Sequence, residues 1–204
     1  IAAVESTAEL ERHWYEEFLW ALRQGAIPAG RILSNAGARD YKADTSTINC
    51  TVSGTLADSM ESILSLNTEA GLTLKAGCGI GYEFSTLRPA GATVAGAGAR
   101  TSGPLSFMEI FDKTCLTVSS AGGRRGAQMA TFDVSHPDVL EFIRAKREPG
   151  RLRQFNLSLL ITDEFIRAVE QDRPWPLVFP IKATSLAEAR KKAGKKGILW
   201  RTWP

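Results

Sequence analysis

Cysteine is scarce in this chain of 204 residues, and its few copies stand far apart. The three cysteines, Cys50, Cys78 and Cys115, form no C-x-x-C motif, which excludes the usual zinc and dithiol spacings. An odd count also argues against a disulfide-paired scaffold and favours a reducing compartment. Cys78 and Cys115 are therefore expected to be buried structural residues, and only Cys50 has a context that suggests chemistry.

Long apolar runs and a large charge excess are also missing. No run approaches the roughly 20 apolar residues that cross a bilayer, and the first residues carry neither a basic flank nor a signal-like core. The net charge of +3 is too small to predict nucleic-acid binding. The two histidines, His13 and His136, are expected to be structural, and no metal site is predicted. These features predict a cytoplasmic protein with neither a membrane nor a nucleic acid as a direct partner.

What is present is an ordinary globular composition, 44% hydrophobic and 23% charged, without an internal repeat. Short apolar runs predict strands at residues 48–52, 80–84, 127–134 and 155–161, with a last apolar run at 175–179. Helices are predicted from a capping box at Ser6 to Gly25, from Asp58, from Pro104, from residues 135–138 and over residues 162–171. This alternation predicts an α/β fold with largely parallel strands.

The most distinctive local feature is the segment SSAGGRRGAQM at residues 119–129. Its paired glycines allow the backbone to approach a ligand closely. Arg124 and Arg125 add planar, permanently charged groups that suit a phosphate or the face of a base. From these residues alone, a nucleotide-binding loop and a solvated basic turn both stay open.

Together with several other segments, this loop resembles the large catalytic component of ribonucleotide reductases, specifically the adenosylcobalamin-dependent (class II) enzymes. The matching segments are SNAG at residues 34–37, NC at 49–50, DSMESI at 58–63, GCGIGYEFSTLRP at 77–89, SGPLSFMEIFD at 102–112, HPDVLEFI at 136–143 and FNLS at 155–158. The resemblance implies the N-terminal portion of that family's ten-stranded α/β barrel. It divides the chain into an N-terminal helical segment (1–27), a partial barrel with effector and specificity loops (28–180) and a basic connector (181–204).

The resemblance also assigns substrate-handling residues. Cys50 matches the first member of the redox cysteine pair that delivers two electrons to the substrate ribose. The substrate-binding residues that it implies are Ser34, Ala36, Gly37, Asn49 and Arg125.

For the allosteric effector, a deoxynucleoside triphosphate, the resemblance implies that Asp58 binds the sugar. Gly96, Gly98 and Arg100, in the loop at residues 91–101, would surround the phosphates. The specificity-loop residues that it implies are Gly122, Gly123, Arg124, Arg125, Gly126 and Gln128. The helices that begin at Asp58 and Pro104 would form a homodimer interface.

The family's radical-cysteine element, Asn-Pro-Cys-Gly-Glu, and its second redox cysteine do not occur in these 204 residues. The resemblance therefore implies part of a ribonucleotide reductase for DNA-precursor synthesis, inactive until a C-terminal part or a second chain completes it. That part would bind most of the adenosylcobalamin, and a thioredoxin-like protein would supply electrons. Two alternatives stay open: a non-catalytic regulatory module that binds an effector nucleotide, and the catalytic chain of an iron-dependent (class I) reductase.

Overall fold

A computed structural model describes most of the chain. The described residues are 2, 7–38, 40–41, 46–94, 98–118, 126–180 and 199–201. The backbone divides into two compact units, Ile1–Asn49 and Cys50–Pro204. None of the helices in these ranges has the length and apolar content needed to cross a membrane. The predicted divisions after residues 27 and 180 stay predictions.

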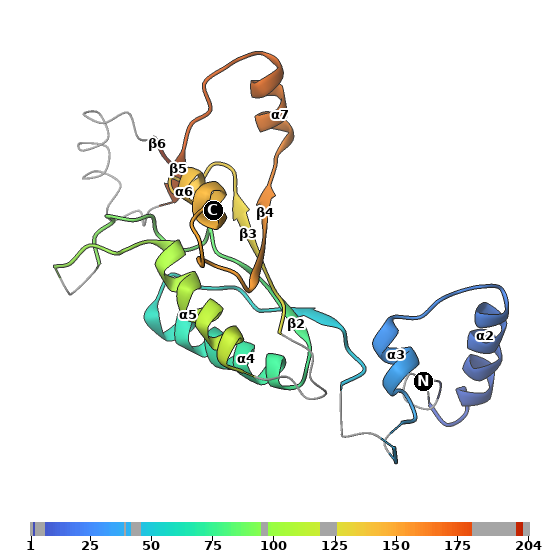
Figure 1. Cartoon of the computed structure of the whole chain (residues 1–204). Helices are drawn as coiled ribbons and strands as arrows, with labels where there is room; N and C mark the ends of the chain where they lie inside the picture. Colours follow the sequence, from blue (N-terminus) through green and yellow to red (C-terminus); the bar gives the residue numbers. More distant parts are fainter. Residues whose placement is uncertain are drawn as a thin grey trace. The chain divides into compact units, whose positions relative to one another are not determined.

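In the described part of the first unit, residues 7–38 form the helices α2 (Glu11–Arg23) and α3 (Gly30–Asn35), drawn in blue in Figure 1. The periodicity of large apolar residues predicted α2, although no side chain caps its start and the predicted cap, Ser6, lies outside the described residues. Gly25, with φ of 94°, follows the end of α2. The sequence did not predict α3, because six residues make fewer than two turns and show no periodicity.

The second unit is built on a parallel sheet with strand order β1-β2-β3-β4. Its strands are β1 (Cys50–Val52), β2 (Gly79–Glu83), β3 (Gln128–Asp133) and β4 (Phe155–Leu160). The connecting helices are α4 (Met60–Lys75), α5 (Pro104–Thr117) and α6 (Val139–Arg144), with the 3-10 turn Ala145–Arg147 after α6. The predicted α/β class with parallel strands is confirmed.

Beyond the sheet, α7 (Asp163–Glu170) begins at Thr162, whose hydroxyl accepts a hydrogen bond from the Phe165 amide. The chain then forms a separate parallel pair, β5 (Val178–Pro180) with β6 (Leu199–Arg201). The strand β6 lies where the sequence predicted only a connector.

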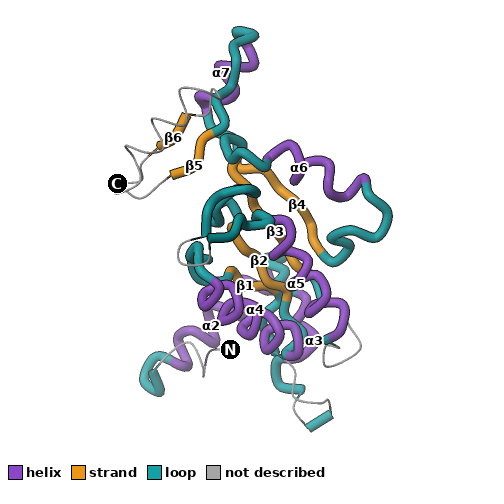
Figure 2. Tube along the Cα trace, turned by 90° about the vertical axis from the view of Figure 1, so that its left-hand side faces the viewer, coloured by secondary structure: helices purple, strands orange, loops and turns teal. Residues whose placement is uncertain are grey.

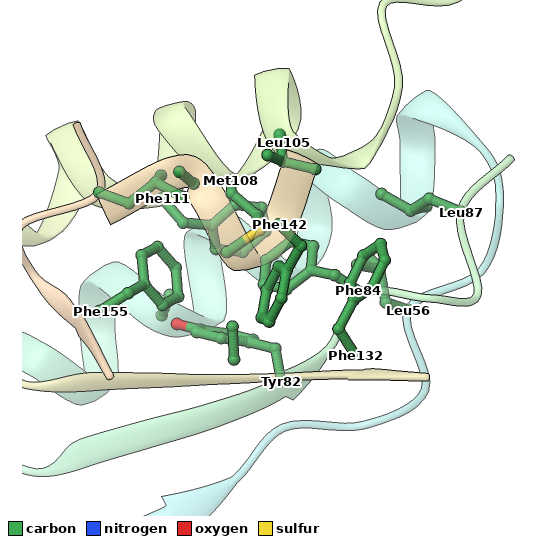
Figure 3. Packing of buried hydrophobic residues seen from close by; sticks show 14 of the residues in the cluster. Leu56, Tyr82, Phe84, Leu87, Leu105, Met108, Phe111, Phe132, Phe142 and Phe155 are labelled. Atoms are coloured by element: carbon green, nitrogen blue, oxygen red, sulfur yellow. The ribbon is translucent and has the colours of Figure 1, made fainter. Parts of the chain in front are cut away.

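Large aromatic side chains fill the space between the helices and the sheet (Figure 3). The Tyr82 ring meets Phe111 of α5 with centroids 5.0 Å apart, and Phe132 stacks on Phe142 of α6 at 4.5 Å. Helices α4 and α5 run alongside one another over the strands (Figure 2). All three connecting helices therefore cover the same face of the sheet.

The start of α4 differs from the prediction. Its cap is Ser59, whose hydroxyl accepts a hydrogen bond from the Ser62 amide, and not Asp58. The Asp58 carboxylate is instead bound by Arg88, 30 residues further along the chain. Because both residue types are good N-caps, only the long-range ion pair decides between them.

The turn between β3 and α6 is fixed by His136, which is buried as a structural residue, as predicted. Its Nε2 donates to the Leu87 carbonyl at 3.0 Å, and its Nδ1 accepts from the Asp138 amide at 3.0 Å. Burial lowers the pKa of His136, which favours the neutral ring that these two bonds require. The Asp138 carboxylate in turn accepts the Ala90 amide at 2.8 Å, so this turn holds the loop after β2.

Candidate functional site

The amino edge of the parallel sheet carries the cysteine that the sequence singled out. Cys50 is the first residue of β1, is exposed, and pairs with Gly79 at the start of β2. Cys78 and Cys115 are buried, as predicted, and none of the three cysteines is in a disulfide. Of the described cysteines, only Cys50 is therefore open to a reactant.

Strand register places the Cys50 side chain on the face of the sheet that the helices leave open. Paired residues on neighbouring strands point to the same side, and Ile80 and Tyr82 point toward the helices. Gly79, paired with Cys50, and Gly81, paired with Val52, therefore face away from the helices. Two glycines thus lie beside the thiol, and Met129 follows on β3.

This open face provides space beside Val52, two residues after the thiol on β1. Even a Cβ added to Gly81 would lie 3.9 Å from the nearest atoms, those of Met129. A ligand can therefore approach the backbone of β2 at Gly81, which pairs with Val52, without displacing a side chain, whereas Gly79 beside Cys50 is buried.

A polar group occupies the carboxyl end of the same face, and sequence reasoning missed it. The Glu83 carboxylate accepts hydrogen bonds from the Ser85 amide at 2.9 Å, from the Ser85 hydroxyl, and from the Thr131 hydroxyl at 2.6 Å. The Ser85 hydroxyl accepts the Asp133 amide at 3.0 Å. The alternation of side chains along β2 and β3 could have predicted that Glu83 and Thr131 lie on the same face of the sheet. It could not have predicted that the two residues are hydrogen-bonded. The group links β2 to β3 through a hydrogen-bonded carboxylate.

Two predicted specificity-loop residues, Gly126 and Gln128, also lie at the amino edge. Gln128 is the first residue of β3 and is 1% exposed, so it belongs to the strand and the core rather than to the loop. Its side chain binds the Tyr82 hydroxyl and the Phe111 carbonyl. Gln128 therefore lies where the loop meets β3, and its assignment to the specificity loop stays a prediction.

The predicted substrate-binding residues of the first unit lie around the end of α3. Ser34 belongs to the last turn of α3, Ala36 is its C-cap, and Gly37 follows with φ of 72°. The Asn49 side-chain oxygen is buried, and it accepts no hydrogen bond from the described part of the chain. A buried acceptor of this kind is suited to a ligand hydroxyl or amide.

At the carboxyl edge of the sheet, Asp58 and Arg88 form a half-buried ion pair. Arg88 Nε donates to Asp58 Oδ2 at 2.7 Å and the Arg88 amide donates to Oδ1 at 3.2 Å. The Arg88 Nη1 also donates to the Thr93 carbonyl at 2.9 Å. Arg88 thus joins the loop before α4 to the segment after β2.

That segment, residues 91–101, is a hairpin whose two sides the structure describes. Thr93 and Arg100 form an antiparallel bridge, and the Gly91 amide donates to the Thr101 carbonyl at 2.8 Å. Gly98, with φ of 61°, and Arg100 are both exposed. The predicted effector residues Asp58, Gly98 and Arg100 are therefore linked through Arg88 and the hairpin.

The structure does not bring the two predicted sites together within one chain. Cys50 and Gly126 lie at the amino edge of the sheet, whereas Asp58 and Arg100 follow the carboxyl ends of β1 and β2. The remaining predicted residues, Gly96, Gly122, Gly123, Arg124 and Arg125, lie outside the described residues. Within the described ranges, no three His, Cys, Asp or Glu side chains are grouped to hold a metal ion.

Comparison with known proteins gives a consistent family match. Residues 48–197 match the family model described as "Ribonucleotide reductase, barrel domain". A vitamin B12-dependent ribonucleoside-diphosphate reductase of Mycobacterium tuberculosis (strain ATCC 25618 / H37Rv) is 41% identical over 184 residues, covering 88% of this chain and 25% of that protein. Its namesake from Thermoplasma acidophilum is 35% identical over 149 residues, covering 72% of this chain and 19% of that protein.

Among solved structures, the Actinobacillus ureae class Id ribonucleotide reductase alpha subunit matches with a TM-score of 0.59. The match covers 85% of this chain and 30% of that chain at 20% sequence identity, which shows a shared fold. The chain spans about a quarter of the length of the Mycobacterium relative.

Proposed function

Because this chain belongs to the ribonucleotide reductase family, we propose that it forms part of an enzyme that reduces ribonucleotides to deoxyribonucleotides. The observation that carries the proposal is the exposed Cys50 thiol at the start of β1, on the open face of the sheet beside Gly79. Its relatives named ribonucleoside-diphosphate reductases support the same reaction. A regulatory module would not need an exposed thiol at this position.

The chemistry assigned to Cys50 is a two-electron reduction. Two thiols and the ribonucleotide become a disulfide, the 2′-deoxyribonucleotide and one water, which takes the oxygen of the 2′-hydroxyl. Cys50 supplies one thiol, and the second comes from a cysteine outside this chain. A dithiol reductant of the thioredoxin type then restores both thiols by exchange. Three cysteines outside disulfides are consistent with the proposed reducing, cytoplasmic compartment.

We expect the isolated chain to be inactive and the complemented enzyme to be active. Here the complemented enzyme is this chain together with a polypeptide that supplies the Asn-Pro-Cys-Gly-Glu element and the second redox cysteine. Deoxynucleotide formation is measured by chromatography with adenosylcobalamin and a dithiol. Turnover by the isolated chain would contradict the proposal, and so would an inactive complemented enzyme under both cobalamin and iron-subunit conditions.

Adenosylcobalamin is the proposed cofactor because several relatives are named vitamin B12-dependent. The described residues do not fit it as a binding site. His136, the histidine of the second unit, uses both ring nitrogens in hydrogen bonds of the core and is not available to the cofactor. We therefore derive no step through the cofactor. Turnover that depends on an iron-containing subunit instead would favour the class I alternative.

The substrate ribonucleotide is proposed to contact Asn49, whose buried side-chain oxygen can accept a hydrogen bond. The turn after α3, with Ser34, Ala36 and Gly37, would add backbone amides as donors. Arg125 is proposed to reach the base or the phosphates, with Gly122, Gly123 and Arg124 as its loop neighbours. The planar guanidinium suits either target.

A deoxynucleoside triphosphate effector is proposed at the Asp58–Arg88 junction. The geometry leaves a lone pair on each Asp58 oxygen for the effector's sugar hydroxyl, while Arg100 and the glycines Gly96 and Gly98 are proposed to meet the phosphates. The Asp58 carboxylate is already held by Arg88, so little ordering would be needed on binding.

We expect Asp58→Ala to weaken effector binding by one charge-assisted hydrogen bond, about 1.5–3 kcal/mol. Calorimetric titration of the complemented enzyme with each deoxynucleoside triphosphate measures the effect. Asp58→Ala also leaves the Arg88 guanidinium without its carboxylate partner. Arg88→Lys is therefore the matched variant, because lysine keeps the positive charge but lacks the planar guanidinium. Wild-type affinity in Asp58→Ala would place the effector elsewhere.

A homodimer through α4 and α5 is proposed, since large apolar side chains stand exposed on both helices. They are Met60, Leu64, Leu72 and Leu116, each at least half exposed. Such a row of apolar residues is typical of an interface. Antiparallel pairing of two copies would bring the carboxyl edge of one sheet toward the amino edge of the other, and so bring effector residues close to the specificity loop.

A further inference from the structure

The residues that lead into β3 are fixed to the helix layer by buried contacts. Gln128 is 1% exposed, although the preceding Ala127 is exposed. The Ala127 carbonyl accepts the Ile80 amide at 3.1 Å, which puts this backbone level with the Cys50–Gly79 pair. The entrance of β3 therefore lies on the same edge as the reactive thiol.

The Gln128 amide binds two different elements. Its Nε2 donates to the Phe111 carbonyl of α5 at 3.0 Å, and its Oε1 accepts the Tyr82 hydroxyl of β2 at 3.0 Å. A carbonyl can only accept, so the nitrogen must face α5 and the oxygen must face Tyr82. Tyr82 is itself 3% exposed and packs edge-on against Phe111 and Phe155. The amide thus has one orientation in which both of its ends are satisfied.

Gly126 adds a steric contact with the same helices. A Cβ at Gly126 would lie 2.8 Å from Cys115 Sγ of α5 and 2.9 Å from Leu74 Cδ2 of α4. A Cβ there would require the Cys115 or Leu74 side chain to shift, so the Gly126 backbone packs closely on both helices. Burial raises the pKa of the Cys115 thiol to about 11, as expected for a closed apolar site.

The same part of α5 also holds the start of β4. Asp112 Oδ1 accepts the Gln154 amide at 2.8 Å, and the Gln154 carbonyl accepts the Gln128 amide at 3.1 Å. The stretch of α5 from Phe111 to Cys115 therefore contacts the entrances of both β3 and β4. A shift of α5 along or around its axis is therefore expected to move residues 126–128, which it contacts through Phe111 and Cys115.

We propose that Gln128 is a positioning residue that couples α5 to the amino edge of the sheet, and that it does not itself contact a nucleotide. This inference rests on the proposed function, in which α5 belongs to the dimer face and residue 126 ends the specificity loop. Effector binding at that face then changes substrate choice through α5, Gln128 and the entrance of β3.

Thiol accessibility in the isolated chain gives the first test. Cys115 lies against Gly126, and Cys78, the buried thiol directly before β2, is the internal reference. With iodoacetamide and mass spectrometry, Gln128→Leu is expected to raise the Cys115-to-Cys78 ratio of alkylation rates about tenfold through local opening. Phe142→Leu, a core change under α6, is the matched control and should leave the ratio unchanged. An unchanged ratio in Gln128→Leu would overturn the coupling.

Substrate choice in the complemented enzyme gives the second test. Four ribonucleotides are assayed with and without each deoxynucleoside triphosphate. In Gln128→Leu, the substrate preference measured with an effector is expected to lie within about twofold of the preference measured without one. This loss of allosteric coupling should be larger than the loss of turnover. Phe142→Leu should keep the wild-type preference. A wild-type pattern in Gln128→Leu would show that its role is only structural.

Two outcomes separate this inference from the proposed function. If the wild-type complemented enzyme forms no deoxynucleotide, the proposed function fails, and the alkylation ratio still decides whether Gln128 holds the edge. If Gln128→Leu does not fold, Tyr82→Phe removes one hydroxyl from the same contact and serves in both assays. Tyr82→Phe with a wild-type ratio and a wild-type preference would overturn the inference.

Discussion

Cys50→Ser is expected to abolish repeated turnover of the complemented enzyme when a thioredoxin-type protein is the reductant. Serine cannot form a disulfide, so the two electrons for the ribose cannot be delivered or restored. The rate should fall by roughly a thousandfold or more, as when a residue that acts directly on the substrate is removed. Folding should change by less than about 0.5 kcal/mol, because the side chain is exposed and the substitution is nearly isosteric.

The control is Cys78→Ala, which removes a buried thiol from the neighbouring strand entrance. It should lower the free energy of unfolding and leave turnover of the folded enzyme near the wild-type rate. Peptide mapping after a single turnover without reductant completes the test. Deoxynucleotide that accumulates while Cys50 stays a free thiol would refute its redox role, and full activity of Cys50→Ser would favour the regulatory-module alternative.

Gly103→Ala is expected to destabilise the second unit by about 3 kcal/mol, which combines backbone strain with overpacking. Gly103 precedes α5 with φ of 91°, and a Cβ there would lie 2.9 Å from Ala90 and from the Asp138 carboxylate. Two of these atoms, the Ala90 amide nitrogen and Asp138 Oδ2, form the hydrogen bond that joins the loop after β2 to the β3–α6 turn. The substitution must break that bond or displace the start of α5.

Urea unfolding followed by circular dichroism measures the loss. Gly91→Ala is the matched control, because Gly91 has a similar φ of 81° but no atom within 4 Å of the added Cβ. It should cost about 1 kcal/mol, the strain of a left-handed backbone alone. Equal losses in the two variants would mean that the close packing around Gly103 contributes nothing.

Local signals in the sequence were sufficient for most elements of the sheet unit. Pro104 occupies the first turn of α5, where its missing amide proton costs nothing, and Thr162 caps α7. Short apolar runs located the four strands to within about two residues. The order of the motifs also identified the family, because each motif requires a particular residue at a particular turn.

Contacts between distant segments were beyond such reasoning. Ser59 and Asp58 are both good helix caps. Ser59 caps α4 because the Asp58 carboxylate is bound by Arg88, which lies far along the chain. Gln128 follows a polar loop, and from the sequence it is interpreted as part of that loop. In the structure, hydrogen bonds with Tyr82 and with the Phe111 carbonyl of α5 make the burial of its side chain favourable.

The sequence by itself determined the α/β class, the parallel strands, the family and the position of Cys50 on a short strand, whereas the structure showed that Cys50 begins that strand. The tertiary structure alone decided which face of the sheet stays open to that thiol, because the face depends on strand register and on the side that the helices cover. It also decided that Asp58 and Cys50 lie at opposite edges of one sheet. Local periodicity fixes how each segment folds, whereas the pairing of segments depends on long-range contacts that a single sequence does not display.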